Sequence, residues 1–301
     1  MRGALRGGPT SILSAQVKAA MTEEQKTQHD SDYKALLALY IALLSAFDKG
    51  EKEEALYNLS ELRTDQAFSH VLSGLGIDYD YAVMLLRNMD DNNISQHDKD
   101  LRDRLRAAIL NLIDFCVCEE YQLYSESSDL IGDSEVDFES EEYDELIALC
   151  SKYNDSYAAI ENGDIEYAAM IAAKWISFSS LDYLVYWTQN DVKVRPWHMA
   201  LQGYAASRDE FPSWMIPPIE YNCRCFLEAI DVRASVSKSA ASIKGTVKNI
   251  EKPKELDGVY SESLAKCGRI FSKEHPYFKV KRSDKDMLQG FVSRLKEKYN
   301  V

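Results

Sequence analysis

The sequence predicts an α+β protein, in which a predominantly α-helical N-terminal region is followed by a small α+β platform with a short sheet. Two observations support this prediction. Apolar residues recur at three- and four-residue steps through much of the first 186 residues, which is the period of an amphipathic helix. Residues 187–230 instead hold three of the four Trp, four of the seven Pro and a Cys-Arg-Cys, a composition typical of a rigid, loop-rich segment.

Composition divides the chain into five segments. Residues 1–30 mix Gly, small residues and charges without periodicity, so we expect a flexible leader there. Residues 31–186 are expected to form a helical domain, and residues 187–231 the platform. A basic linker over 232–254 and a C-terminal segment over 255–301 follow, and the C-terminal segment is expected to pack on the platform.

The helical domain should contain several helices in succession. Ser31 and Asp32 are suited to cap a helix that runs to about Lys49, with Gly50 after it. Further helices are expected over residues 51–72, 78–89, 98–124, 141–162 and 164–189, with Gly163 separating the last two. Another amphipathic helix, with Met287, Phe291 and Leu295 on one side, is expected in the C-terminal segment.

The charge balance favours protein partners or small ligands. A net charge of −14 disfavours nucleic-acid binding, except through residues 232–254, where positive charges exceed negative charges by five. Residues 119–145 hold twelve Asp or Glu and no Lys or Arg, and we expect a solvated loop there. No membrane anchoring is expected, because the apolar run over residues 35–47 falls short of the ~20 residues that span a bilayer.

The block RPWHMALQG predicts one helical turn. Pro196 suits the first position of a helix, because its missing N–H is not needed there, and Gly203 suits the end. His198 and Leu201 then fall three residues apart on one face. We expect His198 to be fixed by a hydrogen bond while Trp197 and Leu201 pack, with a catalytic or ligand role for His198 as the alternative.

The block PPIEYNCRCFLEAI predicts an extended segment followed by a strand. Pro217 and Pro218 each force the residue before them out of the helical region. A strand from Cys223 onward would place Cys223, Cys225, Leu227 and Ala229 on one face, with both thiols toward the core. Alternate strand residues lie about 6.5–7 Å apart, which disfavours a Cys223–Cys225 disulfide and is awkward for two zinc ligands unless the backbone bends.

Three interpretations of these thiols remain open. The simplest is a pair of buried, reduced cysteines, since the six Cys of the chain lack the spacing of a disulfide framework and indicate a reducing compartment. The second is a zinc site made by His198, Cys223 and Cys225 with a fourth group such as His275 or Cys267. The third is a Cys–His nucleophile pair. No catalytic motif is found, so a non-enzymatic role is expected.

This part of the chain resembles the C-terminal motif of the phage Mu F-like minor head proteins, the phage head morphogenesis family. The resemblance covers residues 187–280, and GRIFSKEHPYF is similar to the versions in Bacteroidetes phages and prophages. Ile219, Glu220 and Tyr221 depart from the family pattern after Pro-Pro. The matching residues are Trp187, Val194, Arg195, His198, Leu201, Gly203, Phe211, Trp214, Pro217, Pro218, Asn222, Cys223, Arg224 and Cys225.

The resemblance implies a low-copy minor capsid protein that binds near the portal vertex. Such a protein would contact portal, capsid or scaffold proteins in procapsid assembly or early DNA delivery, in the virion and, during assembly, in the host cytoplasm. The resemblance implies no catalysis. The alternative from another class is an injected effector or enzyme, of nuclease, transferase or toxin-like type, that uses His198 with Cys223 or Cys225.

Overall fold

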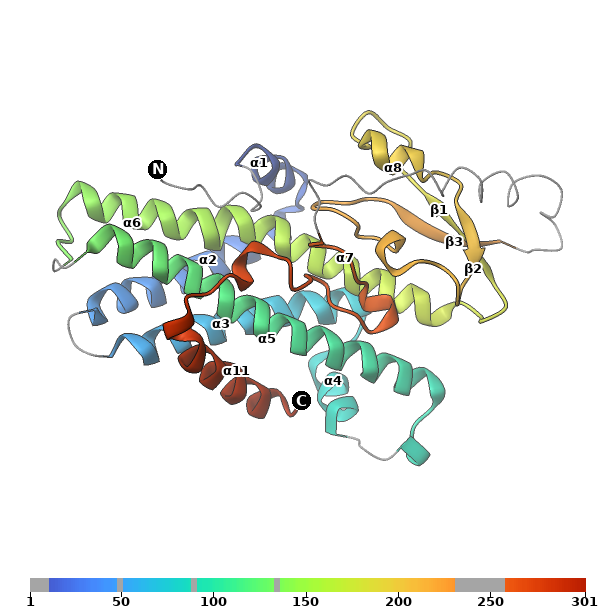
Figure 1. Ribbon diagram of the computed structural model, residues 1–301, viewed down its shortest axis with the longest axis horizontal. Helices are drawn as coiled ribbons and strands as arrows, with labels where there is room; N and C mark the ends of the chain where they lie inside the picture. The colour runs from blue at the N-terminus through green and yellow to red at the C-terminus, as the bar shows by residue number, and fades with distance from the viewer. Residues whose placement is uncertain (1–10, 48–50, 88–90, 133–135, 231–257) are drawn as a thin grey trace. The chain divides into compact units, whose positions relative to one another are not determined.

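The computed structural model describes residues 11–47, 51–87, 91–132, 136–230 and 258–301, and it confirms the predicted fold class: helices predominate, and one small antiparallel sheet accompanies them (Figure 1). The chain forms two compact units. Unit 1 comprises Met1–His70, Ile109–Gly163 and His275–Val301, and unit 2 comprises Val71–Ala108 and Asp164–Glu274. Each unit is therefore assembled from separated stretches of sequence, which differs from the consecutive segments expected from composition.

The regular secondary structure described in unit 1 is entirely helical, and its helices are joined by short irregular segments such as residues 136–140 and 279–281. Three helices, α3, α5 and α7, contribute residues to both units. The helices of unit 1 are α1 (Ser11–Ala20), α2 (Glu23–Ala46), most of α3 (Lys52–Leu75), the second part of α5 (Gln96–Ile131), α6 (Glu141–Ser151), the start of α7 (Ala158–Ser177) and α11 (Lys285–Tyr299). In the described ranges, no helix has both the length and the apolar content needed to cross a bilayer.

The expectation of a flexible leader over residues 1–30 is wrong for the part of it that is described. Residues 11–20 form α1, and α2 begins at Glu23 rather than after Ser31. Thr22 caps α2: its hydroxyl accepts the Gln25 N–H, while the Gln25 side chain accepts the Thr22 N–H. This reciprocal pair is a capping box, and it satisfies two N–H groups at the start of the helix. The expected helix end at Lys49 and Gly50 lies outside the described residues.

Two glycines lie inside helices, and one of them, Gly163, was expected to separate two helices. Gly163 is within α7, which continues to Ser177, and Gly74 is within α3. A Cβ on Gly74 would lie 2.2 Å from the backbone oxygen of Glu166, so the glycine permits the close approach of α3 and α7 within unit 2. The expected helix over 141–162 also differs, because Lys152–Tyr157 forms a π-helical turn between α6 and α7.

A buried ion network lies at the centre of unit 1. The Arg63 guanidinium is fully buried, with its Nε 2.9 Å from a Glu119 carboxylate oxygen and its Nη1 donating to Asn162 over 2.8 Å. Burial, followed by the negative charge of Glu119, raises the pKa of both Glu120 and Glu161 well above the usual range. The solvated loop expected over residues 119–145 is therefore wrong at its start, where Glu119 and Glu120 are buried on α5.

We expect Arg63→Ala to lower the free energy of unfolding by about 3–5 kcal/mol, because it leaves a buried carboxylate without its cation. The measurement is urea denaturation followed by circular dichroism. Lys281→Ala is the matched control, since Lys281 and Asp129 form an exposed ion pair in the same unit, and its loss should cost less than about 1 kcal/mol. Equal costs for the two variants would contradict a central role for the network.

Unit 2 contains the sheet, whose strands are β1 (Tyr183–Trp187), β2 (Ala205–Ser207) and β3 (Phe226–Ile230). β1 lies between the other two and pairs antiparallel with both (Figure 1). The expected helix over 164–189 is wrong after Ser177. A turn in which Asp182 accepts the Ser179 N–H ends it, and the aromatic and β-branched run YLVYW, which favours a strand, follows.

Several shorter elements complete unit 2. They are the end of α3, the start of α5, α4 (Tyr79–Arg87), α8 (Pro196–Ala200) and the 3-10 turns Asp91–Asn93, Ser213–Met215 and Leu264–Lys266. The C-terminal segment is split between the units, because described residues 258–274 belong to unit 2 and residues 275–301 to unit 1. The basic linker expected over 232–254 lies outside the described residues.

Candidate metal centre

Residues 188–225, here called the loop block, leave the sheet at the end of β1 and return to it at the start of β3. In the register of the two strands Trp187 is opposite Phe226, so both ends of the loop block begin at the same edge of the sheet. The block contains α8, β2 and one 3-10 turn, and its other residues are irregular. Side chains must therefore supply much of what holds its two halves together.

The first half of the loop block presents His198. Pro196 occupies the first turn of α8, with Arg195 as the N-cap residue and the buried Leu201 as the C-cap residue. Gly203 follows with a φ of +79°, and its N–H donates to the Tyr186 oxygen of β1 over 2.8 Å. The expected single turn bounded by Pro196 and Gly203 is confirmed, and it holds the His198 ring inside the protein.

The second half presents the two thiols, and here the predicted strand is wrong at its start. Strand β3 begins at Phe226, so Cys223 and Cys225 precede it. Asn222 has a φ of +54°, a left-handed conformation that Asn adopts more readily than most residues. The backbone therefore bends just before the thiols, and both are buried, as expected. Pro217 and Pro218, joined by a cis peptide bond, lie upstream of the bend.

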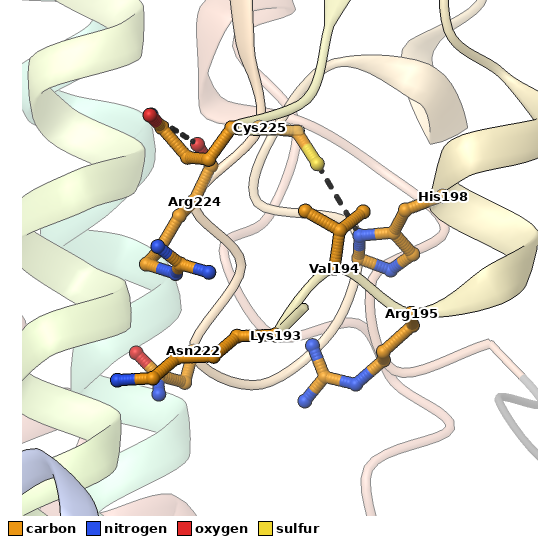
Figure 2. Close-up of a pocket in the computed structure, with 8 residues that line it drawn as sticks. Lys193, Val194, Arg195, His198, Asn222, Arg224 and Cys225 are labelled. Atoms are coloured by element: carbon orange, nitrogen blue, oxygen red, sulfur yellow. Dashed lines mark hydrogen bonds between the residues drawn. The ribbon is translucent and has the colours of Figure 1, made fainter. Parts of the chain in front are cut away.

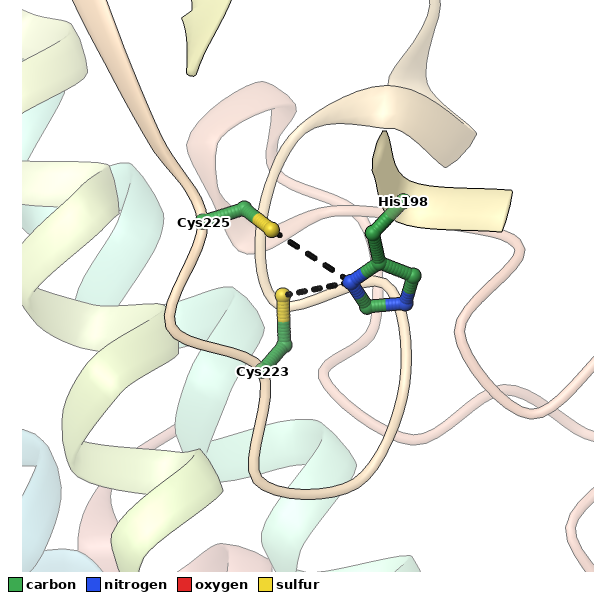
Figure 3. A group of neighbouring side chains, drawn as sticks. All are labelled: His198, Cys223 and Cys225. Carbon is green, nitrogen blue, oxygen red and sulfur yellow. Dashed lines mark hydrogen bonds between the residues drawn. The ribbon is translucent and has the colours of Figure 1, made fainter. Parts of the chain in front are cut away.

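The two halves meet at one nitrogen atom. His198 Nδ1 lies 3.3 Å from the Cys225 sulfur and 3.9 Å from the Cys223 sulfur, and both sulfurs point toward it (Figure 3). The three ligand atoms all lie within 4.8 Å of one another. The six cysteines of the chain all lie in the described ranges, and none of them forms a disulfide. Among the described residues this is the one group of His, Cys, Asp or Glu side chains with the spacing of a metal site.

The other ring nitrogen of His198 faces Glu220. His198 Nε2 lies 3.2 Å from Glu220 Oε2, and Trp197 Nε1 donates to the same oxygen over 2.9 Å. The Arg195 Nε lies 3.0 Å from the other carboxylate oxygen, Oε1. Arg195 also donates from Nη2 to the Tyr221 carbonyl over 2.8 Å. Glu220 is thus the acceptor on which α8 is fixed.

The pKa values of the two cysteines are shifted in opposite directions. A hydrogen bond from Cys223, together with the His198 and Tyr186 side chains, lowers the pKa of Cys225 to about 5 against the opposing effect of burial. Burial raises the pKa of Cys223 well above its usual range. Burial also opposes protonation of His198, but its hydrogen bonds to Cys225 and Glu220 prevail and raise its pKa. In the protein alone, the negative charge of the cluster therefore resides on Cys225.

A small pocket opens beside the cluster and is lined by residues from both halves of the loop block. His198 and Cys225 are among its lining residues, and the other lining side chains are mostly polar (Figure 2). Arg224 at its edge donates from both terminal nitrogens to Asp191, each over 2.8 Å. The lining residues are Gln189, Lys193, Val194, Arg195, His198, Asn222, Arg224 and Cys225.

Two residues of α7 anchor the loop block and were not predicted from the sequence. Asp164, fully buried, accepts the Asn222 N–H over 2.8 Å and the Tyr260 hydroxyl over 2.6 Å. Tyr167 donates its hydroxyl to the Cys225 carbonyl over 2.6 Å. Asp164 follows Gly163, so the sequence suggests an exposed residue at the start of a helix rather than a buried anchor. A buried acid on a helix face is the signal that could have found it.

The fourth zinc ligand expected from the sequence is not found in the group. Cys267 is exposed and does not belong to the cluster. His275 belongs to unit 1, where its ring contacts Phe115 and its Nδ1 accepts the Tyr277 N–H. Burial lowers the pKa of His275 to about 3, so it is a neutral core histidine. Within the ranges that the structure describes, the site therefore offers three protein ligands, which are one imidazole and two sulfurs.

Comparison of the chain with protein-family models, with curated proteins and with solved structures finds no match. The chemistry of the site must therefore be argued from its own geometry. A nitrogen and two sulfurs converging on one point can bind a soft metal ion, and a thiolate beside an imidazole can act as a nucleophile where a substrate reaches it.

We expect iodoacetamide to alkylate Cys267 in the native protein before it modifies Cys223 or Cys225. Alkylation requires an accessible thiolate, and both cluster cysteines are buried while Cys267 is exposed. Mass spectrometry of peptides after a time course makes the measurement, with a urea-unfolded sample as the control in which all six sites react. Faster reaction of Cys225 in the native state would instead support a nucleophilic role.

We expect Asp164 to make unit 2 less stable at alkaline than at acidic pH. Burial raises its pKa to about 7, whereas an Asp in an unfolded chain titrates near pH 4. The stability that the protonated group contributes is therefore complete below about pH 4 and is lost as the pH rises through about 7.

Urea denaturation of the native protein and Asp164→Asn at about pH 5 and about pH 8 tests this. The amide of Asn can still accept the Asn222 N–H but does not ionise. The stability advantage of the native protein over the variant should shrink by about 2.5–3 kcal/mol between these values, because part of the effect is already lost at pH 5. A difference that is constant with pH would show that Asp164 does not titrate in this range.

Proposed function

We propose that the chain is a phage minor head protein of the head morphogenesis type. It binds the portal protein and neighbouring capsid or scaffold proteins, and it acts in procapsid assembly or early DNA delivery. It would reside in the virion and, during assembly, in the host cytoplasm. The proposal starts from the resemblance over residues 187–280, in which the order and spacing of fourteen motif residues agree with the family.

One observation supports the proposal most directly: residues of the motif contact one another. His198 contacts both Cys223 and Cys225, although the motif places them more than twenty residues apart. The motif thus describes one folded block, which explains why its spacing is more informative than any single residue. A self-supporting block of this kind suits a protein that acts by presenting a fixed surface to partners.

The contact surface must then be sought among exposed side chains of the loop block, because the motif residues at its centre are buried. Val192 is fully exposed, and Met199 is partly exposed. The loop that carries Val192 is held in place by the ion pair between Arg224 and Asp191. An apolar side chain on a fixed loop supplies hydrophobic contact with little loss of conformational entropy on binding.

The alternative is an injected effector or enzyme in which Cys225 and His198 react with a substrate. The observation that favours it is the 3.3 Å separation of the two side chains, which is typical of an activated thiol. The burial of both sulfurs counts against it, since a nucleophile must reach its substrate. A nuclease, transferase or toxin-like activity that Cys225→Ser abolishes without loss of folding would favour this alternative.

We expect Val192→Asp to weaken capture of the portal protein encoded in the same genome by about tenfold or more, equivalent to about 1.4 kcal/mol. The charge prevents burial of an apolar side chain in the interface but should leave folding unchanged, because Val192 is exposed. Pull-down with purified portal protein provides the measurement. Met170→Asp, which changes an exposed Met on α7, is the matched control and should bind normally.

The result against the proposal is equally clear. If the native chain, correctly folded, does not bind the portal protein, the assembly function is wrong. If it binds and Val192→Asp binds as well, this surface is not the contact. His198→Ala belongs in the same series, because loss of binding together with a lower melting temperature identifies His198 as a support of the loop block.

A further inference from the structure

The geometry of the cluster agrees with tetrahedral zinc. Zinc lies about 2.0–2.1 Å from a histidine nitrogen and about 2.3 Å from a cysteine sulfur, and tetrahedral angles then separate nitrogen from sulfur by about 3.6 Å. The two separations from His198 Nδ1 are 3.3 Å to Cys225 and 3.9 Å to Cys223, one on each side of this value. Both sulfurs lie on the same side of the ring nitrogen (Figure 3).

Hydrogen bonds alone do not explain why two sulfurs face the same nitrogen of His198. A histidine nitrogen has either one proton to donate or one lone pair to accept with, but His198 Nδ1 faces two sulfurs. One of the two buried sulfurs must then lack a good partner at the nitrogen. A single metal ion between the three atoms engages all of them at once.

The surroundings of His198 are those of a metal ligand. Histidines that bind metals commonly donate their other ring N–H to a carboxylate, which fixes the tautomer and orients the ring. His198 Nε2 faces Glu220 in this way, over 3.2 Å. A neutral ring that donates there has its lone pair at Nδ1, directed at the sulfurs. Glu220 is itself held by Trp197 and Arg195, so the ring has little freedom to turn.

The segment with the two cysteines is fixed equally well. The Asn222 N–H donates to the buried Asp164, and the Cys225 carbonyl accepts the Tyr167 hydroxyl. These bonds hold the backbone on both sides of Cys223. Cys223 and Cys225 lie outside β3, which begins at Phe226, so the spacing of alternate residues in a straight strand, which is awkward for one ion, does not apply to them.

We propose that unit 2 binds one Zn²⁺ ion through His198 Nδ1 and the sulfurs of Cys223 and Cys225, with a water molecule as the fourth ligand. Two sulfurs and an imidazole select zinc over magnesium or calcium, which prefer oxygen. Among the described residues no fourth side chain of ligand type joins the group, and a small pocket is lined by two of the three ligand residues, His198 and Cys225 (Figure 2).

The bound ion joins the two halves of the loop block. His198 comes from α8, and the cysteines come from the bend before β3, more than twenty residues later in the chain. The three ligands are not preassembled in an unfolded chain, so the free energy of zinc binding adds to the free energy of folding. The proposal does not depend on the assembly function proposed above.

The first test is metal content. The full chain, purified under reducing conditions without chelator, should contain about one zinc per chain by elemental analysis, and replacement with Co²⁺ should give the sulfur-to-cobalt charge-transfer and ligand-field bands of a tetrahedral thiolate site. Less than about a tenth of an equivalent of zinc, together with no such bands after Co²⁺ is added, would overturn the proposal.

Variants assign the ligands. Cys223→Ser, Cys225→Ser and His198→Asn should each lose zinc or weaken the cobalt bands, whereas Cys267→Ser, which changes an exposed cysteine outside the cluster, should keep both. Retention of full zinc by Cys225→Ser would show that the site lies elsewhere. Because a ligand variant can also unfold, the native chain is heated with and without a zinc chelator: a lower melting temperature with chelator supports the site, and an unchanged one contradicts it.

Discussion

The carboxylate of Glu220 joins the two halves of the loop block, and the rest of the site depends on it. Arg195, Trp197 and His198 all approach it from the first turn of α8, while Glu220 itself lies on the segment that leads to the cysteines. Hydrogen bonds to an ionised carboxylate are roughly twice as strong as neutral ones. Removing the Glu220 carboxylate would leave the partly buried Arg195 guanidinium without its ion pair and the His198 ring without the contact that orients it. The sulfurs of Cys223 and Cys225 would then no longer face a fixed ring nitrogen.

Unit 1 applies the same principle in its core, where one arginine is surrounded by acidic side chains. Ion pairs that are fully buried recover little net stability, because desolvation costs about as much as the attraction returns. In this structure Arg63 of α3 contacts Glu119 of α5 and Asn162 of α7, so the pairing of its guanidinium depends on how these three helices are arranged. Both units are thus fixed by polar contacts that a purely apolar core would not require.

The sequence was sufficient for features that depend on neighbouring residues. The helical periods, the single turn from Pro196 to Gly203 and the extended Ile216 before Pro217 all follow local rules, and all are found. Errors arose where distant residues decide the outcome. The helix expected to end at residue 72 continues through Gly74, where the close packing of α3 against α7 outweighs the weak helix propensity of glycine.

The site shows the same limit. The burial of both thiols was predicted from alternation, but their convergence on His198 requires the bend at Asn222, and nothing local requires that bend. Asp164 lies 58 residues before the backbone N–H that it accepts, a separation over which periodicity is uninformative. Glu220 was visible only as a departure from a motif. Its role depends on which way α8 faces, a property of the folded chain.

The division of unit 1 into separated stretches determines the order in which it can be completed during synthesis. Helix α11 supplies Phe291 and Tyr299, whose rings pack against Tyr57 and Phe68 of α3. The N-terminal helices therefore leave the ribosome with an apolar face that has no cover until residues 275–301 have also emerged. Unit 2 ends at Glu274, so its last residue is synthesised before residues 275–301 of unit 1. Unit 2 is therefore complete first, although most of it lies later in the chain than the N-terminal helices of unit 1.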